Sequence, residues 1–372
     1  MTPARSARRY RRLRLGLVVA LAALLPACRV RHAEPAAGGG GPVERWQSMA
    51  DAGLGRRTGR VAAWTGSDMV VWGGAFVCSN DRCDEEVPDP NADGAAYSPA
   101  TDRWRPLSPS PLAARDRPVM VAAADQVLIW GGSVGSRFMA DGAAYVPADD
   151  TWRPLPASPL AARAGAAAVW TGRELLVWGG SAGSTYFADG AGYTPRTGRW
   201  RTLPESPLSA RVGPSAVWTG RELVAWGGTG SNGYLADGAA FDPVRGTWAM
   251  LPAAPLAARG GQAAVWTGSQ MVIWGGGSEQ AVFADGAFYD PDLQRWSSMS
   301  ASPLSPRAGP AAVWSGFELV VWGGGGDRFD FFADGASYSP VTDQWLAIKP
   351  GPLEARGRPA GVWSGRDLLV WG

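Results

Sequence analysis

Two serine motifs are the first places where this sequence could carry chemistry. The pattern Gly-x-Ser-x-Gly occurs at residues 131–135 and again at residues 179–183. A serine in this pattern acts as a nucleophile on a strand-to-helix turn, with a histidine as its base. Here the next expected element is a strand, and the one histidine, His32, lies far upstream in a segment rich in Gly and Ala. We therefore assign no catalytic residues.

Two other short motifs match phosphate and calcium sites only in part. Glycines at 228, 230 and 233 have the spacing of a dinucleotide-binding loop, but no helix is expected after them. Residues 89–94 match the first half of an EF-hand loop, whose twelfth position requires a bidentate Glu and is Ala100 here. We predict neither a metal ion nor a cofactor.

The two cysteines Cys78 and Cys83 lie close together in an insertion of about ten residues. In an exported protein such a pair is typical of a disulfide. A thiolate metal site is a weaker interpretation, because zinc prefers four ligands and no histidine is near. The same insertion is acidic, with Asp81, Asp84, Glu85, Glu86 and Asp89.

The first 27 residues are typical of a signal peptide. Residues 1–14 hold six arginines and no acid, and the apolar run at 15–25 is much shorter than the roughly 20 residues that span a bilayer. The run ends in Leu-Pro-Ala-Cys28, which resembles a bacterial lipobox and implies lipidation of Cys28. We expect a lipoprotein of the bacterial cell envelope, with an ordinary secreted protein as the alternative, and a flexible tether at 28–45.

Charge argues against a nucleic-acid partner. The chain has 35 basic and 33 acidic residues, and removing the leader's six arginines leaves 29 basic residues against 33 acidic ones. A nucleic-acid-binding domain is usually strongly basic, so this balance predicts none. The 51 glycines and 30 prolines favour short strands joined by tight turns over long helices.

Four markers recur along the chain at intervals of about 48 residues. Trp-Gly occurs at Trp72, Trp130, Trp178, Trp226, Trp274, Trp322 and Trp371. Asp-Gly occurs at Asp93, Asp141, Asp189, Asp237, Asp285 and Asp334. An arginine precedes each unit at Arg57, Arg115, Arg163, Arg211, Arg259, Arg307 and Arg356. An aromatic residue is followed seven residues later by Trp104, Trp152, Trp200, Trp248, Trp296 and Trp345.

One unit divides into four short strands, which we name a to d. They are expected at 163–170, 175–178, 191–194 and 199–203. Four antiparallel strands repeating at about 50 residues indicate a β-propeller. The chain is therefore expected to be all-β.

The Gly-Gly pair, the following Tyr and the Trp seven residues after it resemble the kelch repeat, over residues 46–372. One departure is Ala122, where strand a otherwise has Trp. Another concerns the His that many kelch units carry after the arginine, because this slot holds Ala166, Pro214, Gln262 and Pro310. The resemblance implies kinship with galactose-oxidase-type propellers, but copper radical oxidation needs histidine ligands and a Cys–Tyr cross-link, so we disfavour it.

Counting strands predicts seven blades. The strand of Trp46 would lie at the outer edge of a last blade begun by residues 356–372, and strand c of that blade is missing. We expect the continuation of the chain to supply it. Otherwise the N-terminal strand would have to move into the empty place.

Residues that recur in every unit are expected to form the scaffold. All twenty tryptophans belong to strands a, b or d. The recurrent arginines and aspartates are expected to form structural pairs on one rim, although a positive ring facing a ligand is the alternative. The expected pairs include Arg163 with Asp189, Arg211 with Asp237 and Arg259 with Asp285.

The variable parts of the units are the b–c loops, which predict a binding surface on one rim. The best contact candidates are Arg137, Tyr186, Tyr234, Glu279, Arg328 and Asp330. The first hypothesis is a non-catalytic, monomeric propeller that binds a protein or a carbohydrate. The alternatives are a sugar-processing enzyme such as a mutarotase or a sialic-acid-epimerase-like propeller, and a purely structural envelope protein.

Overall fold

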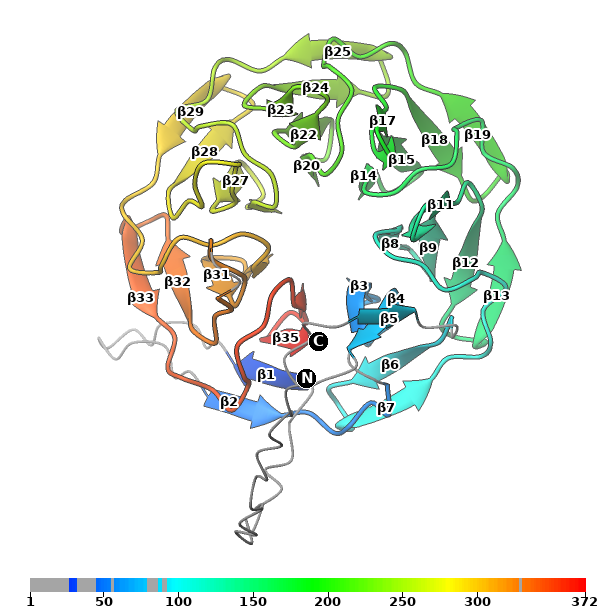
Figure 1. The fold of residues 1–372 in the computed structure, drawn as a ribbon, viewed down its shortest axis with the longest axis horizontal. Coiled ribbons are helices and arrows are strands. Elements are labelled where there is room, and N and C mark those ends of the chain that lie inside the picture. Colours follow the sequence, from blue (N-terminus) through cyan, green and yellow to red (C-terminus); the bar gives the residue numbers. More distant parts are fainter. Residues whose placement is uncertain (1–26, 32–44, 55–56, 79–85, 89–91, 328–329) are drawn as a thin grey trace, which may run out of the picture.

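The computed structural model describes residues 27–31, 45–54, 57–78, 86–88, 92–327 and 330–372. Within these residues the fold is all-β and consists of seven antiparallel blades arranged as a ring (Figure 1). The innermost strand of each blade contacts the innermost strands of both neighbouring blades. The ring is therefore closed, and the predicted seven-bladed propeller is confirmed.

Blade three shows how the repeat forms a sheet. Its strands are β14 (Ala167–Trp170), β15 (Leu175–Trp178), β18 (Gly190–Thr194) and β19 (Arg199–Thr202), hydrogen-bonded in that order. Strand β15 is continuously apolar because both of its faces are covered. Strand β14 begins four residues later than expected, because Ala164 pairs with Ser181 of the b–c loop instead.

The other contiguous blades repeat this order. Blade one is formed by β3 (Arg57–Trp64), β4 (Met69–Cys78), β6 (Gly94–Ser98) and β7 (Arg103–Pro106), with β5 (Glu86–Pro88) paired to β4. Blade two is formed by β8 (Val119–Ala123), β9 (Gln126–Trp130), β12 (Gly142–Val146) and β13 (Thr151–Pro154). Blade four is formed by β20 (Ser215–Trp218), β21 (Leu223–Trp226), β24 (Gly238–Asp242) and β25 (Thr247–Met250). Blade five is formed by β26 (Ala263–Trp266), β27 (Met271–Trp274), β28 (Gly286–Asp290) and β29 (Arg295–Ser298). Blade six is formed by β30 (Ala311–Trp314), β31 (Leu319–Trp322), β32 (Gly335–Ser339) and β33 (Gln344–Ala347).

Blade seven joins the two ends of the described chain. Its order is β34 (Ala360–Trp363), β35 (Asp367–Trp371), β1 (Ala27–Arg31) and β2 (Arg45–Ser48), so blue and red segments share one sheet in Figure 1. Strand β2 takes the expected outer place. The place of strand c, which we expected to be empty, is filled by β1.

Residues 28–31 therefore lie inside the propeller in this structure, whereas we expected a tether to begin at residue 28. The physical reason is that an unfilled place would leave the backbone donors and acceptors of β35 and β2 without partners. Val30 of β1 lies opposite Leu368, at the register position that Tyr193 occupies opposite Leu175 in blade three. Residues 32–44 lie outside the described residues.

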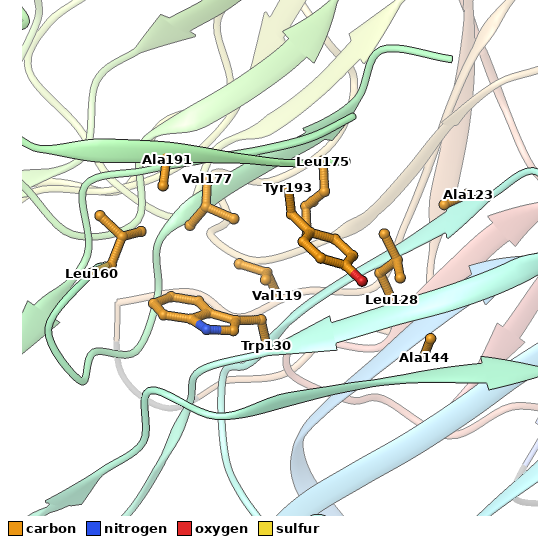
Figure 2. Packing of buried hydrophobic residues seen from close by; sticks show 10 residues of the cluster. All are labelled: Val119, Ala123, Leu128, Trp130, Ala144, Leu160, Leu175, Val177, Ala191 and Tyr193. Atoms are coloured by element: carbon orange, nitrogen blue, oxygen red, sulfur yellow. The ribbon is translucent and has the colours of Figure 1, made fainter. Parts of the chain in front are cut away.

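The core consists of wedges between neighbouring blades. Each b-strand tryptophan is exposed by 2% or less and fills one wedge. In the wedge between blades two and three, Trp130 packs with Leu160, Val177 and Ala191 (Figure 2). The d-strand tryptophans lie further out, and each indole N–H donates to a backbone oxygen of the link before its blade, as Trp200 does to Pro156 at 3.1 Å. These aromatic side chains therefore support the scaffold.

Candidate functional site

In blades two to six, the arginine at the start of the repeat is buried on the rim that carries the b–c loops. Arg163 forms a fork with Asp189, with Nη1–Oδ1 and Nη2–Oδ2 distances of 2.6 and 3.1 Å. Its Nη1 also donates to Gly179 O, and its Nε donates to Ala161 O. The guanidinium is thus used by four bonds within the scaffold.

The same arrangement is present in blades two to six. The Nη1–Oδ1 distances are 2.9 Å for Arg115–Asp141, 2.8 Å for Arg211–Asp237, 2.7 Å for Arg259–Asp285 and 2.8 Å for Arg307–Asp334. These arginine side chains are fully buried. In three blades a phenylalanine ring lies under the guanidinium: Phe187 under Arg163, Phe283 under Arg259 and Phe332 under Arg307, at about 4 Å. The geometry is that of a structural pair, and these arginines are not presented to a ligand.

Burial and ion pairing act in opposite directions on the pKa of Asp141. Partial burial disfavours ionisation of Asp141, but the hydrogen bonds and charge of Arg115 outweigh it and lower the pKa of this carboxyl below its ordinary value. The aspartates remain half-exposed on the rim. The arginine partner therefore stabilises the ionised form of Asp141.

Short hairpins rise from the rim in the b–c loops. In blades two to four they are β10 (Ser133–Val134) with β11 (Arg137–Phe138), β16 (Ser181–Ala182) with β17 (Thr185–Tyr186), and β22 (Thr229–Gly230) with β23 (Gly233–Tyr234). Single bridges form the equivalents in blades five and six, namely Gly277–Val282 and Gly325–Phe331. The hairpins present side chains that differ from blade to blade on one rim.

The last residue of each hairpin is aromatic in four of these five blades and is at least partly exposed. These residues, with Val282 at the fifth place, form what we call the rim row: Phe138, Tyr186, Tyr234, Val282 and Phe331. Tyr186 and Tyr234 were predicted from the sequence, whereas Phe138 and Phe331 were missed. The signal was an aromatic residue three positions before the Asp in four of the six Asp-Gly pairs.

The other predicted contacts lie at the hairpin tips. Arg137, Glu279 and Asp330 are exposed, in blades two, five and six. The structure places them on the same rim as the two tyrosines but on separate hairpins, so they do not form one compact cluster. Arg328 lies outside the described residues.

A second ring of residues precedes the innermost strands. Six equivalent positions have a left-handed backbone with φ between 47° and 65°. Three neighbouring pairs are hydrogen-bonded, from Gly165 N to Arg117 O, from Gly213 N to Gly165 O and from Gly309 N to Gly261 O. Four of the six are glycine, which adopts this conformation without strain. The other two are the exposed residues Arg117 and Arg358. Sequence reasoning did not single out these two arginines.

The cysteine predictions remain largely outside this structure. Cys83 lies outside the described residues, and the side chain of Cys78 is also not described, so the expected disulfide stays a prediction. Cys28 is buried in β1, and burial raises the pKa of its thiol. Its lipidation likewise stays a prediction.

Metal and membrane features were sought in the described part of the chain. No group of three or more His, Cys, Asp or Glu side chains there is arranged to hold a metal ion. In the same residues, no helix has the length and apolar character needed to cross a bilayer.

Comparison with known proteins agrees with this geometry. Residues 165–372, more than half of the chain, match the family model described as the KLHDC2/KLHL20/DRC7 Kelch-repeats domain. A search of curated proteins returned no match. The chain belongs to the kelch-repeat family of β-propeller proteins.

Proposed function

We propose that this protein is a non-catalytic binding propeller that holds a protein or carbohydrate ligand on its b–c rim. The observation that carries the proposal is the rim row, in which four aromatic side chains occupy equivalent, at least partly exposed places on the hairpins of blades two, three, four and six. Exposed aromatic residues next to variable polar residues are typical of binding surfaces. The repeated arginines of blades two to six lie beneath this surface and are already paired with aspartates.

The contacts of the repeated Arg–Asp pairs give less support to an enzymatic function. A mutarotase-like or epimerase-like mechanism would need carboxylates and arginines free to reach a sugar. In blades two to six the repeated Arg–Asp pairs are bound to each other and to backbone oxygens. We therefore place binding before catalysis.

We also propose that the protein is exported and anchored at the bacterial cell envelope by a lipid on Cys28. The support is the arginine-rich, apolar leader that ends at this cysteine. Because Cys28 is fully buried between β35 and β2, a lipid on its sulfur requires β1 to leave this place. Labelling with a clickable fatty acid tests this, and Cys28→Ser should abolish the label.

Binding is tested by comparing the two rims of the full-length protein. A variant with Phe138→Ala, Tyr186→Ala, Tyr234→Ala and Phe331→Ala should lose ligand capture on a glycan array and in cross-linking on intact cells. The matched control removes the exposed apolar side chains of the opposite rim, with Val244→Ala, Leu293→Ala and Val341→Ala. Loss of capture in the control but not in the rim variant would contradict the proposal.

A further inference from the structure

A pocket lies between the outer strand of blade three and the link that leads into this blade. Its volume of about 440 Å³ falls within the range of roughly 300–1,000 Å³ that is typical of small-molecule sites. Its lining comes from two segments. One is the link, with residues 156–159, and the other is the c–d turn with strand β19, which contributes Gly198, Arg199, Trp200 and Thr202. The c–d turn lies at the end of the blade opposite the b–c loop, so the pocket is separate from the rim row.

In two other blades an aspartate of the c–d turn occupies the equivalent place. Asp150 of blade two accepts a hydrogen bond from Ser108 N of the link at 3.1 Å, and Tyr145 donates to the same carboxylate at 2.7 Å. Asp343 of blade six likewise accepts from Ser300 N of its link at 3.1 Å. In both blades the aspartate therefore connects the turn to the link.

Blade three lacks this connection. Its turn has Gly198 in the place of Asp150 and so has no side chain there. Its link has Pro156 in the place of Ser108, and proline has no N–H to donate. The pocket thus opens where blades two and six have the aspartate and its hydrogen bond.

The lining of the pocket carries one positive charge. Arg199 is exposed and has no ion pair among the residues that the structure describes, whereas Arg201 on the same strand is paired with Glu174 at 2.7 Å. An unpaired guanidinium beside a pocket favours an anionic ligand, and its planar fork suits a carboxylate.

The rest of the lining suits a sugar ring. Trp200, Pro156 and Pro159 provide apolar surface for the C–H groups of a ligand. Ser158 and Thr202 provide hydroxyls for hydrogen bonds. A ligand that matches the whole lining has C–H groups, several hydroxyls and one carboxylate.

We propose that this pocket binds a uronate, a six-membered sugar ring that carries a carboxylate, and that Arg199 binds the carboxylate. Trp200 and the two prolines contact the C–H groups of the ring, and Ser158 and Thr202 bind its hydroxyls. The proposal goes beyond the function proposed above, because the pocket and the rim row share no residue.

The test uses saturation-transfer NMR on the full-length protein with D-glucuronate and D-galacturonate, each compared with its neutral parent sugar, D-glucose or D-galactose. At least one uronate should bind, and its parent sugar should bind at least about tenfold more weakly, the equivalent of about 1.4 kcal/mol. No binding of either uronate would overturn the site. Equal affinities for a uronate and its parent sugar would overturn the role of the charge.

Arg199→Gln removes the charge from an exposed position, where a substitution leaves the fold intact. It should weaken uronate binding by about tenfold and leave the affinity for the parent sugar unchanged. Unchanged uronate binding in this variant would contradict the assigned role of Arg199.

Gly198→Asp places a carboxylate in the pocket. The fold already accommodates aspartate at this turn position, because Asp102, Asp150 and Asp343 adopt φ of 50° to 53° in blades one, two and six. Tyr193 can donate to the new carboxylate as Tyr145 does to Asp150. The variant should lose uronate binding without a lower melting temperature, and retained binding would overturn the pocket as the site.

Gly246→Asp is the matched control. Gly246 holds the same turn position in blade four, where Thr247 and Met250 take the places of Arg199 and Thr202. This substitution should change uronate affinity less than about twofold, since the two turns belong to different blades. Equal losses in the two aspartate variants would show that the site is not in blade three.

The four-alanine variant of the rim row separates this site from the binding function proposed above. It should keep uronate binding while it loses capture by the rim. If it lost uronate binding and Gly198→Asp kept it, the sugar acid would bind at the rim row. The pocket proposal would then be wrong, and the binding function of the rim would stand.

Discussion

Blade three and blade seven have the same four-strand order but differ in how the chain completes them. Blade three is contiguous, and its strand β18 has Tyr193 opposite Leu175 and an Asp-Gly pair before it. In blade seven the equivalent strand β1 comes from the other end of the described chain, with Val30 in place of the tyrosine and no Asp-Gly before it. The comparison teaches that register and apolar character are enough to fill the place of strand c in a blade.

The largest expected difference comes from placing a charge at the matched position of each blade. Tyr193→Asp buries an unpaired carboxylate in a contiguous blade and should cost about 3–5 kcal/mol. Val30→Asp should cost clearly less, because β1 can leave the sheet while the rest of the ring stays folded. Urea unfolding of the two variants measures both costs, and equal losses would show that β1 is as integral as β18.

The next difference concerns the rim arginines. Arg163→Ala removes four scaffold bonds from a buried site, and we expect a loss of about 2–3 kcal/mol. Arg356, its equivalent in blade seven, is partly exposed, so Arg356→Ala should cost less than about 1 kcal/mol. Chemical denaturation followed by tryptophan fluorescence gives both values. A large loss at Arg356 would show that blade seven has a rim contact as strong as the repeat pair.

Alkaline pH should lower the stability of blades that have a tyrosine in strand c, whereas blade seven lacks this tyrosine and should be insensitive. Burial and a 2.7 Å hydrogen bond to Asp150 raise the pKa of Tyr145 to about 12. A raised pKa means that the folded state holds the proton more tightly than the unfolded chain does. Its stabilising contribution is complete below pH 10 and is lost as the pH rises through about 12.

Tyr145→Phe should therefore make the fall of unfolding free energy between pH 10 and pH 12 less steep. The measurement is urea unfolding at a series of alkaline pH values. Val30→Ile in blade seven is the control, and it should leave the slope unchanged. An unchanged slope in Tyr145→Phe would contradict the role of this tyrosine.

The smallest expected effects lie in the left-handed ring. Gly213 has φ +61° and open space around its Cα, so Gly213→Ala adds backbone strain without a clash and should cost about 1 kcal/mol. Arg358 has the same conformation in blade seven, and Arg358→Gly should change stability by less than about 1 kcal/mol, since relief of strain is offset by chain entropy. Differential scanning calorimetry of both variants shows whether each substitution raises or lowers the stability.

Much of the fold could be predicted because each blade is encoded locally. The apolar run of Leu175–Trp178, the Tyr193–Trp200 spacing and the glycine turns specify four strands within one unit, and each unit repeats them. The rim pairs were also within reach, because Arg163 and Asp189 recur in register with these strands. Strand β14 begins later than predicted because Ala164 pairs with Ser181 of the b–c loop. No local sequence pattern indicated this pairing.

The candidate site was predicted only in part. Tyr186 and Tyr234 stood out as single tyrosines in variable loops, but Phe138 and Phe331 resembled ordinary apolar residues until their shared place on the hairpins was visible. Gln262 was visible as a departure from the repeat. Its hydrogen bond to the backbone oxygen of Trp226 in the preceding blade depends on how the two blades pack, which sequence spacing does not show.

The sequence by itself determined the blade, because in blades one to six the interactions that form it lie within about 50 residues and recur from unit to unit. Only the tertiary structure decided what lies between blades and at the closure of the ring. Which strand fills blade seven, which residues form the left-handed ring, and which side chains meet at the junction of blades four and five depend on contacts between units. Such contacts are set by packing and by the need to pair every buried backbone group, and no pattern inside one repeat records them.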